Sequence, residues 1–103
     1  MPKTYNAKFS SFGSFTPAKI RNNFDLEKIV DTSDEWIRTR TGMFERHIAS
    51  ENEAASDLAY QAAVRAIESS SVKYKDIDHI IIATISGDHP FPSTACIIQK
   101  KLG

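Results

Sequence analysis

Residues 80–86, with the sequence IIIATIS, decide the fold class of this chain. The apolar residues in this run leave no regular alternation with polar ones, so the pattern differs from that of a strand with one solvent-facing side. Such a run is typical of a strand buried on both faces in the middle of a layered α/β sheet. A central strand needs a neighbour along each edge and helices above and below it. The sequence therefore predicts an α/β fold.

The elements around this run are too few to complete such a sheet. A helix is predicted over Asn52 to Ser70, because its small apolar residues recur on one continuous face. Those residues are Ala55, Leu58, Ala59, Ala62, Ala63, Ala66 and Ile67. A first strand is predicted over Lys8 to Phe15, and a short extended segment over Met43 to Ile48. The sequence thus predicts a larger sheet than it supplies, and the fold is incomplete in this chain.

Capping signals predict the shorter helices. Asn22 or Asn23 is expected to cap a helix that runs to Val30. Ser93 is expected to cap a last helix, Thr94 to Leu102, with Gly103 at the position that favours a positive φ angle. The loop before that helix, residues 87–92 (GDHPFP), carries Phe91 near its tip.

The stretch Asp31 to Arg46, DTSDEWIRTRTGMFER, contains the only tryptophan of the chain. Thr32 and Glu35 have the spacing of a capping box, and Gly42 is suited to end a helix of about two turns over residues 33–41. Trp36 and Arg40 stand four residues apart and so share one face of that helix. An indole beside a guanidinium, next to the positive end of a helix, suits a ligand that is partly aromatic and partly phosphate. The alternative is that Trp36 fills the core and Arg40 lies over it with its charge in water; the residue chemistry alone favours this alternative.

Composition excludes several classes of function. The 103 residues include 13 basic and 13 acidic ones, a balance that argues against a nucleic-acid-binding surface. No apolar run of membrane-spanning length and no secretory leader occurs, so we expect neither a membrane span nor a secretory signal. The single cysteine cannot form an internal disulfide and fits a reducing compartment. A cytoplasmic location is expected.

Several blocks of the sequence resemble β-ketoacyl-acyl carrier protein synthase III, a family of condensing enzymes that start bacterial fatty-acid synthesis. They are DTSDEWIRTRTGMFERHIA (residues 31–49), the alanine-rich helix, IIIATIS, and HPFPSTACIIQKKLG (residues 89–103), in the order of that family. The resemblance implies the N-terminal part of a thiolase-like layered α-β-α-β-α fold. Residues 1–103 would then be the N-terminal segment of the first thiolase-like domain, with no second domain present in this chain. Ser10, Ser11 and Phe12 depart from the aliphatic and glycine residues usual in that family's first strand.

The resemblance also implies roles for particular residues. Trp36 is expected to stack on the adenine of coenzyme A, Arg40 to reach the nucleotide phosphates, and Thr32 to make a polar contact with the nucleotide. Phe91 is expected either to cross a homodimer interface and wall the acyl pocket of the partner, or to anchor its loop on its own subunit. The substrates implied are an acyl-CoA such as acetyl-CoA and malonyl-acyl carrier protein. The coenzyme A thioester is thus a substrate, and no covalently bound cofactor is expected.

Cys96 is the obvious candidate for a nucleophile, because it lies just inside a predicted helix N-terminus. The family resemblance instead implies a catalytic cysteine beyond Gly103, followed by catalytic histidine and asparagine residues. We therefore expect no catalytic residue in this chain, with Cys96 as a small buried apolar residue and His47 as a structural residue. The spacing of the histidines and Cys96 matches no zinc site, so no metal site is expected.

Three functions stay open at this stage. The first is the N-terminal piece of a β-ketoacyl-acyl carrier protein synthase III, inactive as a 103-residue chain alone. The second is a related initiating synthase of polyketide or branched-chain acid pathways. The third is a non-catalytic truncated product that binds a nucleotide or a partner, or that does not fold alone.

Overall fold

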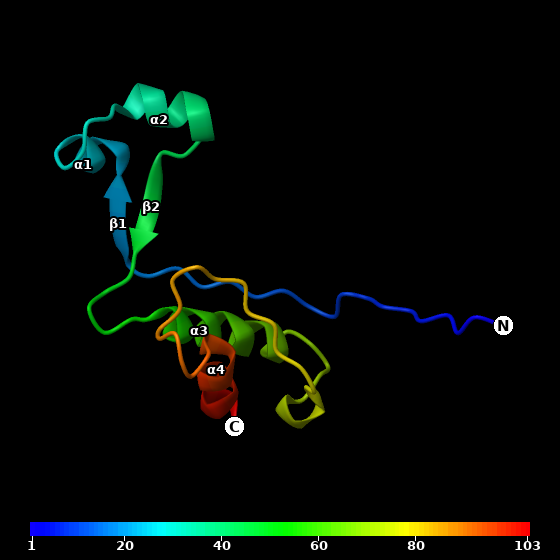
Figure 1. Cartoon of the computed structure of the whole chain (residues 1–103). Coiled ribbons are helices and arrows are strands. Elements are labelled where there is room, and N and C mark those ends of the chain that lie inside the picture. The colour runs from blue at the N-terminus through cyan, green and yellow to red at the C-terminus, as the bar shows by residue number, and fades with distance from the viewer. The chain divides into compact units, whose positions relative to one another are not determined.

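The computed structural model describes residues 1–103, which form two units. The hairpin unit is Thr16–Glu53, and the helical unit combines Met1–Phe15 with Ala54–Gly103. In chain order the elements are β1 (Lys19–Asn22), α1 (Asn23–Glu27), α2 (Asp34–Thr41), β2 (Glu45–Ile48), α3 (Ala55–Glu68), the 3-10 helix η1 (Tyr74–Asp76) and α4 (Thr94–Leu102) (Figure 1).

The hairpin unit is built on two short antiparallel strands, β1 and β2. Their register pairs Lys19 with Ile48 at one end and Asn22 with Glu45 at the other. The extended segment predicted before Ile48 is therefore confirmed as β2. Its partner β1 was not predicted from the sequence.

Asn22 caps α1. The sequence had predicted either Asn22 or Asn23 as this cap. Its side chain accepts a hydrogen bond from the Asp25 amide at 2.9 Å, and the Asp25 carboxylate accepts one from the Asn22 amide at 3.1 Å. The predicted extension of this helix to Val30 is wrong. The amides of Ile29 and Val30 both donate to the Leu26 carbonyl at 3.0 Å, so the chain turns there after α1 has ended at Glu27.

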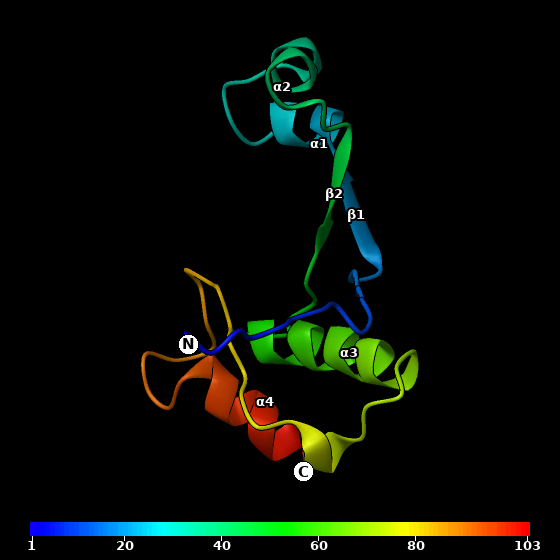
Figure 2. The same ribbon diagram turned by 90° about the vertical axis from the view of Figure 1, so that its right-hand side faces the viewer.

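In the helical unit, α3 packs against α4 (Figures 1 and 2). Both helices were predicted, and α4 has the predicted bounds, with Ser93 as its N-cap and Gly103 at a φ of 84°. Ile98 on α4 is only 1% exposed and forms the apolar centre of this unit. Beside it lies an apolar hollow of about 310 Å³, lined in part by the small α3 residues Ala59, Ala63 and Ala66.

The predicted strand Ile80–Ser86 is not formed. Residues 77–86 run without strand hydrogen bonds, and only one side of the run contacts the helices. Ile81 is 83% exposed and Ile85 is 106% exposed. An apolar run becomes a strand only when another strand hydrogen-bonds to its edge, and no segment of this chain does so here.

The predicted strand Lys8–Phe15 is also absent, for the same reason. Its second half instead lies along α3. The Ser11 hydroxyl donates to the Ala66 carbonyl at 2.6 Å, and Arg65 donates to the Ser14 carbonyl at 2.8 Å. A Cβ atom on Gly13 would lie 2.5 Å from the Ala66 nitrogen, so the close approach to the small-residue face of α3 requires glycine.

Candidate functional site

The helix predicted to carry the site is α2, and both of its ends are capped. Ser33 is the N-cap, since its hydroxyl accepts a hydrogen bond from the Trp36 amide at 3.1 Å. The predicted capping box of Thr32 and Glu35 is therefore wrong by one residue. Gly42 ends the helix with a φ of 72°, as predicted, and its amide donates to the Arg38 carbonyl at 2.9 Å. The two caps hold a helix of only eight residues, which would be marginal on its own.

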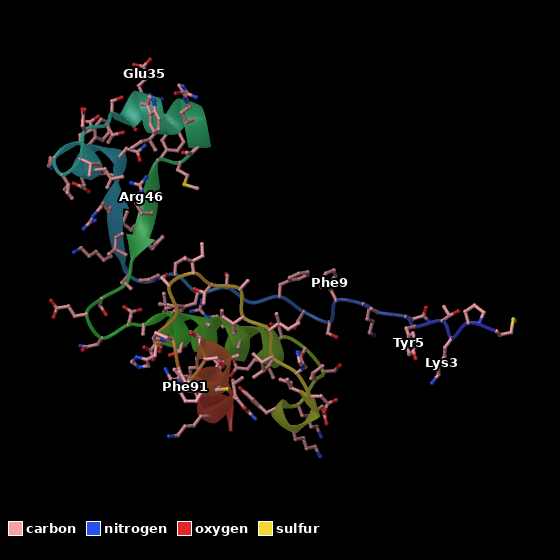
Figure 3. The ribbon with its side chains drawn as sticks, in the orientation of Figure 1. Lys3, Tyr5, Phe9, Glu35, Arg46 and Phe91 are labelled. Atoms are coloured by element: carbon pink, nitrogen blue, oxygen red, sulfur yellow. The ribbon has the colours of Figure 1, made fainter.

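Asn23 ties α2 to the rest of the hairpin unit. Its side chain is fully buried and donates to the Asp34 carboxylate at 2.9 Å and to the Met43 carbonyl at 2.8 Å. The Arg46 guanidinium donates to the Asn23 side-chain oxygen at 2.7 Å and to the Arg21 carbonyl at 3.2 Å. Figure 3 labels Arg46 on β2 within this cluster. One buried amide therefore joins the start of α1, both ends of α2 and β2.

Trp36 and Arg40 lie together on the exposed side of α2, as their spacing predicted. The Arg40 guanidinium carbon is 5.7 Å from the centre of the Trp36 ring, a cation–π geometry. Trp36 is 57% exposed, so it does not fill the core of this chain. The alternative in which Trp36 is a core residue is not what the structure shows.

The other two arginines of this stretch are already engaged. Arg38 pairs with Asp34 at 3.3 Å, and Arg46 is held by Asn23. Arg40 has no carboxylate within 4.0 Å, so its charge is available to an anion. Only one of the three guanidinium groups is thus free to take a phosphate.

The sequence predicted that the positive N-terminal end of α2 would help to attract a phosphate, but acidic groups offset that charge in the structure. The Glu27 carboxylate accepts a hydrogen bond from the Asp34 amide at 2.7 Å, and the Ser33 hydroxyl occupies the Trp36 amide. Asp34 and Glu35 add two carboxylates in the first turn. These acidic groups offset the helix dipole, so a phosphate would be attracted to Arg40 and not to the helix N-terminus.

Thr32 is half-buried one residue before the cap and makes no side-chain hydrogen bond to Trp36 or Arg40. The structure therefore brings together two of the three predicted nucleotide contacts. The role of Thr32 stays a prediction.

Cys96 is exposed, which corrects its expected burial. It lies on the side of α4 turned away from Ile98 and lines a hollow of about 220 Å³ with His79, Ile77 and Ile80. Its sulfur accepts a hydrogen bond from the Ser93 hydroxyl at 3.2 Å, and no histidine nitrogen bonds to it. His47 has a structural contact, with Nδ1 at 2.5 Å from the Pro17 carbonyl oxygen. The structure thus contains no pair of a nucleophile and a base.

The loop that carries Phe91 is fastened at its base to α3. The Asp88 carboxylate accepts hydrogen bonds from the Ser56 amide at 2.8 Å and from the Ser56 hydroxyl at 2.5 Å. These two bonds hold the pKa of the Asp88 carboxyl below its usual value. Phe91 itself is 90% exposed in this chain. Figure 3 labels it near α4. Its two alternative roles, at the acyl pocket of a partner or as an anchor of its own loop, stay predictions.

Sequence reasoning missed the two fully buried polar residues that organise these regions, Asn23 and Ser56. Asn23 was considered only as a possible cap, and no role was predicted for Ser56. No helix of the structure has the length and apolar character that crossing a membrane requires. No group of three or more histidine, cysteine, aspartate or glutamate side chains is arranged to hold a metal ion.

Comparison with known proteins places this geometry in context. No family model matches the chain. The β-ketoacyl-[acyl-carrier-protein] synthase III of Xylella fastidiosa strain Temecula1 is 53% identical over 103 residues, which are 100% of this chain and 32% of that protein. The crystal structure of 3-oxoacyl-[acyl-carrier-protein] synthase III from Aquifex aeolicus superposes with a TM-score of 0.81 at 49% identity, over 89% of this chain and 30% of that one. The priming β-ketosynthase of the R1128 polyketide pathway superposes with a TM-score of 0.82 at 28% identity, over 99% of this chain and 31% of that one.

The fold is therefore the N-terminal part of the thiolase-like fold of condensing enzymes, as predicted from the sequence. Within that class, the chain matches the N-terminal portion of β-ketoacyl-[acyl-carrier-protein] synthase III, and the resemblance drawn from its sequence blocks is confirmed. The chain spans about a third of the length of the relatives it matches.

Proposed function

We propose that this chain supplies the N-terminal part of a condensing enzyme that joins an acyl-CoA, such as acetyl-CoA, to malonyl-acyl carrier protein. In this proposal it contributes part of the coenzyme A site, while the catalytic cysteine, histidine and asparagine lie outside residues 1–103. The cysteine takes the acyl group and releases the coenzyme A thiol. Malonyl-acyl carrier protein then loses carbon dioxide, and its carbanion attacks the cysteine thioester and expels the cysteine thiolate. The role of this chain is to bind and orient the nucleotide end of the substrate.

The observation that carries the proposal is the exposed pair of Trp36 and Arg40. An exposed indole face offers a stacking surface for adenine, and an unpaired guanidinium at 5.7 Å from the ring centre offers a partner for a nearby phosphate. Both sit on a helix whose position is fixed by buried Asn23. A rigid support lowers the entropy lost when the nucleotide binds.

The neighbouring pair of Arg38 and Phe44 provides a natural comparison. Its guanidinium carbon is 5.8 Å from the ring centre and Phe44 is 64% exposed, so the two pairs have nearly the same geometry. Arg38, however, is neutralised by Asp34. We therefore assign the nucleotide to Trp36 and Arg40, with Thr32 as a further polar contact.

The proposal can be tested in a joined enzyme, in which this chain replaces the matching 103 residues of the Xylella fastidiosa relative. Trp36→Ala should weaken coenzyme A binding, measured by calorimetry, by about 1–3 kcal/mol, the scale of one base–aromatic stack. Arg40→Ala should also weaken coenzyme A binding. The loss relative to the unchanged enzyme should be larger at low salt than at high salt, because the contribution of Arg40 is electrostatic.

Phe44→Ala is the matched control and should leave coenzyme A affinity within about a factor of two, because its arginine already has a carboxylate partner. Equal losses for Trp36→Ala and Phe44→Ala, or no loss for either, would remove α2 from the coenzyme A site. The 103-residue chain alone should show no condensation of acetyl-CoA with malonyl-acyl carrier protein. Turnover by it would make Cys96 the first residue to replace.

A polyketide-initiating synthase is the second candidate, since the R1128 priming enzyme superposes as well as the fatty-acid enzyme. The sequence identity of 49% against 28% favours the fatty-acid enzyme. Comparing acetyl-CoA with longer acyl-CoA primers in the joined enzyme separates the two. We also propose a homodimer, which sedimentation tests, and a cytoplasmic location, which cell fractionation tests. The activity assay of the 103-residue chain tests the alternative of a non-catalytic short product.

A further inference from the structure

Helix α2 carries two arginine–aromatic pairs, and they lie on different sides of it. With 3.6 residues per turn, Arg38 is about half a turn around the helix axis from both Trp36 and Arg40. Arg38 reaches Phe44, which follows the end of α2, and its guanidinium carbon is 5.8 Å from the centre of that ring. The Arg40 guanidinium carbon is 5.7 Å from the centre of the Trp36 ring, and both aromatic side chains are more than half exposed. Each pair therefore has the parts that a phosphate and an aromatic base need.

The two pairs differ in one neighbour, Asp34. Its carboxylate lies 3.3 Å from the Arg38 guanidinium, whereas Arg40 has no carboxylate partner. Exposed ion pairs usually contribute little, because both side chains move freely in water. The Asp34 side chain is only 17% exposed, and its other oxygen accepts a hydrogen bond from buried Asn23 at 2.9 Å. Its negative charge is therefore held beside Arg38, where it competes with any incoming phosphate.

We propose that Asp34 determines where a nucleotide binds on α2, because it neutralises Arg38 and so keeps the Arg38–Phe44 pair from acting as a second site. This inference rests on the proposed function, in which Trp36 and Arg40 bind the nucleotide end of the acyl-CoA. Asp34 acts through Arg38 and does not touch the nucleotide. A nucleotide held on the other side of α2 would direct its thioester arm from a different starting point, so a single site also fixes where the acyl group is delivered.

The test counts the coenzyme A molecules bound to the joined enzyme by equilibrium dialysis at low salt. The unchanged enzyme should bind about one per chain, and Asp34→Asn should bind a second, weaker one. Asparagine keeps an oxygen that can accept the Asn23 bond but has no charge, so Arg38 becomes available to a phosphate. The second site should disappear at high salt, because its attraction is electrostatic. Asp34→Glu, which keeps the charge, should not gain the second site.

Glu35→Gln is the matched control. Glu35 lies in the same first turn of α2, is exposed and points outward (Figure 3), and has no arginine or lysine within 4.0 Å of its carboxylate. Its substitution removes the same unit of charge without releasing Arg38, so no second site should appear. Double variants locate the added site. Adding Phe44→Ala or Arg38→Met to Asp34→Asn should abolish it, whereas adding Trp36→Ala should weaken only the first site.

A merely structural role of Asp34 would weaken the first site without adding another, so the absence of a second site in Asp34→Asn would overturn the inference. A second site in Glu35→Gln, or one that persists with Phe44→Ala, would overturn it as well. Asp34→Ser, whose hydroxyl can still accept the Asn23 bond, covers the case in which Asp34→Asn does not fold, and the same outcomes apply to it. Trp36→Ala decides the proposed function separately. If it weakens coenzyme A binding and Asp34→Asn gains no site, only the inference fails; if it has no effect, the proposed function fails and the inference loses its basis.

Discussion

The hairpin unit and the helical unit satisfy their polar backbone groups in different ways. In the hairpin unit, β1 pairs with β2, and buried Asn23 uses its side-chain donors and acceptor on Asp34, Met43 and Arg46. In the helical unit, α3 and α4 are complete, but residues 80–86 have no strand beside them, and Ile81 and Ile85 face outward. The first unit pairs its two strands with each other within 38 residues, whereas the second leaves residues 80–86 without a strand partner. Both units expose large apolar side chains, such as Phe24 and Phe44 in the first and Ile81 and Ile85 in the second.

This difference indicates which part of the chain can hold its shape by local contacts. Trp36 and Arg40 sit on the unit whose two strands are paired, so their geometry depends on residues close in the sequence. Ile81 and Ile85 belong to the unit whose predicted strands have no partner in this chain. Each of the following variants changes one side of this comparison, in order of decreasing expected effect.

Asn23→Ala should cause the largest loss, because it leaves Asp34 and Arg46 without their buried partner. We expect the free energy of unfolding of the hairpin unit to fall by about 2–3 kcal/mol, the cost of buried polar groups left unpaired. Trp36, the only tryptophan of the chain, reports on this unit in a urea titration followed by fluorescence. Asn52→Ala, an exposed asparagine of the same unit, is the control. Equal midpoints for the two variants would mean that the buried network does not hold the hairpin unit together.

Gly13→Ala is the corresponding variant in the helical unit. The new Cβ would meet the Ala62 carbonyl and the Ala66 nitrogen of α3, and overpacking against backbone costs about 1–3 kcal/mol. Hydrogen exchange should quicken over residues 8–15 and the middle of α3, while the Trp36 fluorescence transition stays unchanged. A shift of the Trp36 transition would mean that the two units unfold together. Ser10→Ala, an exposed change three residues earlier, is the control.

Ser33→Ala and Thr32→Ala test the cap of α2 directly. Loss of the Ser33 hydroxyl should lower the stability of the hairpin unit by about 1 kcal/mol, the usual contribution of an N-cap. Thr32→Ala should change it by only a few tenths of a kcal/mol, since its hydroxyl makes no hydrogen bond to the helix. The urea midpoint followed by Trp36 fluorescence measures both. The reverse order of the two effects would restore the capping box that the sequence suggested.

The sequence was sufficient where structure depends on near neighbours. The helices α2, α3 and α4, the glycine that ends α2 and the pairing of Trp36 with Arg40 all follow from spacings of three or four residues. The hubs at Asn23 and Ser56 could not be predicted, because their partners lie 11 to 45 residues away. The strands at Lys8–Phe15 and Ile80–Ser86 were wrongly predicted as formed, because a strand requires a partner that spacing cannot supply. Placement of Cys96 failed for a related reason: which side of α4 is covered depends on what packs there.

The smallest expected effect is the pH dependence of the Phe91 loop. The bond from Lys101 and that from the Ala54 amide hold the pKa of Asp57 below its ordinary value of 3.8, as the Ser56 bonds do for Asp88. A carboxyl whose pKa is lower in the folded state stabilises it above the unfolded pKa, and this contribution is lost as the pH falls through the folded-state pKa. The attachment of this loop to α3 should therefore be intact at neutral pH and weaken only in strong acid, with a small effect because both carboxyls are partly accessible to solvent. Carboxyl NMR titration should give Asp88 a pKa below the ordinary aspartate value of 3.8, and Ser56→Ala should raise it toward that value. An Asp88 pKa at or above the ordinary value would mean that the Ser56 bonds do not form in solution.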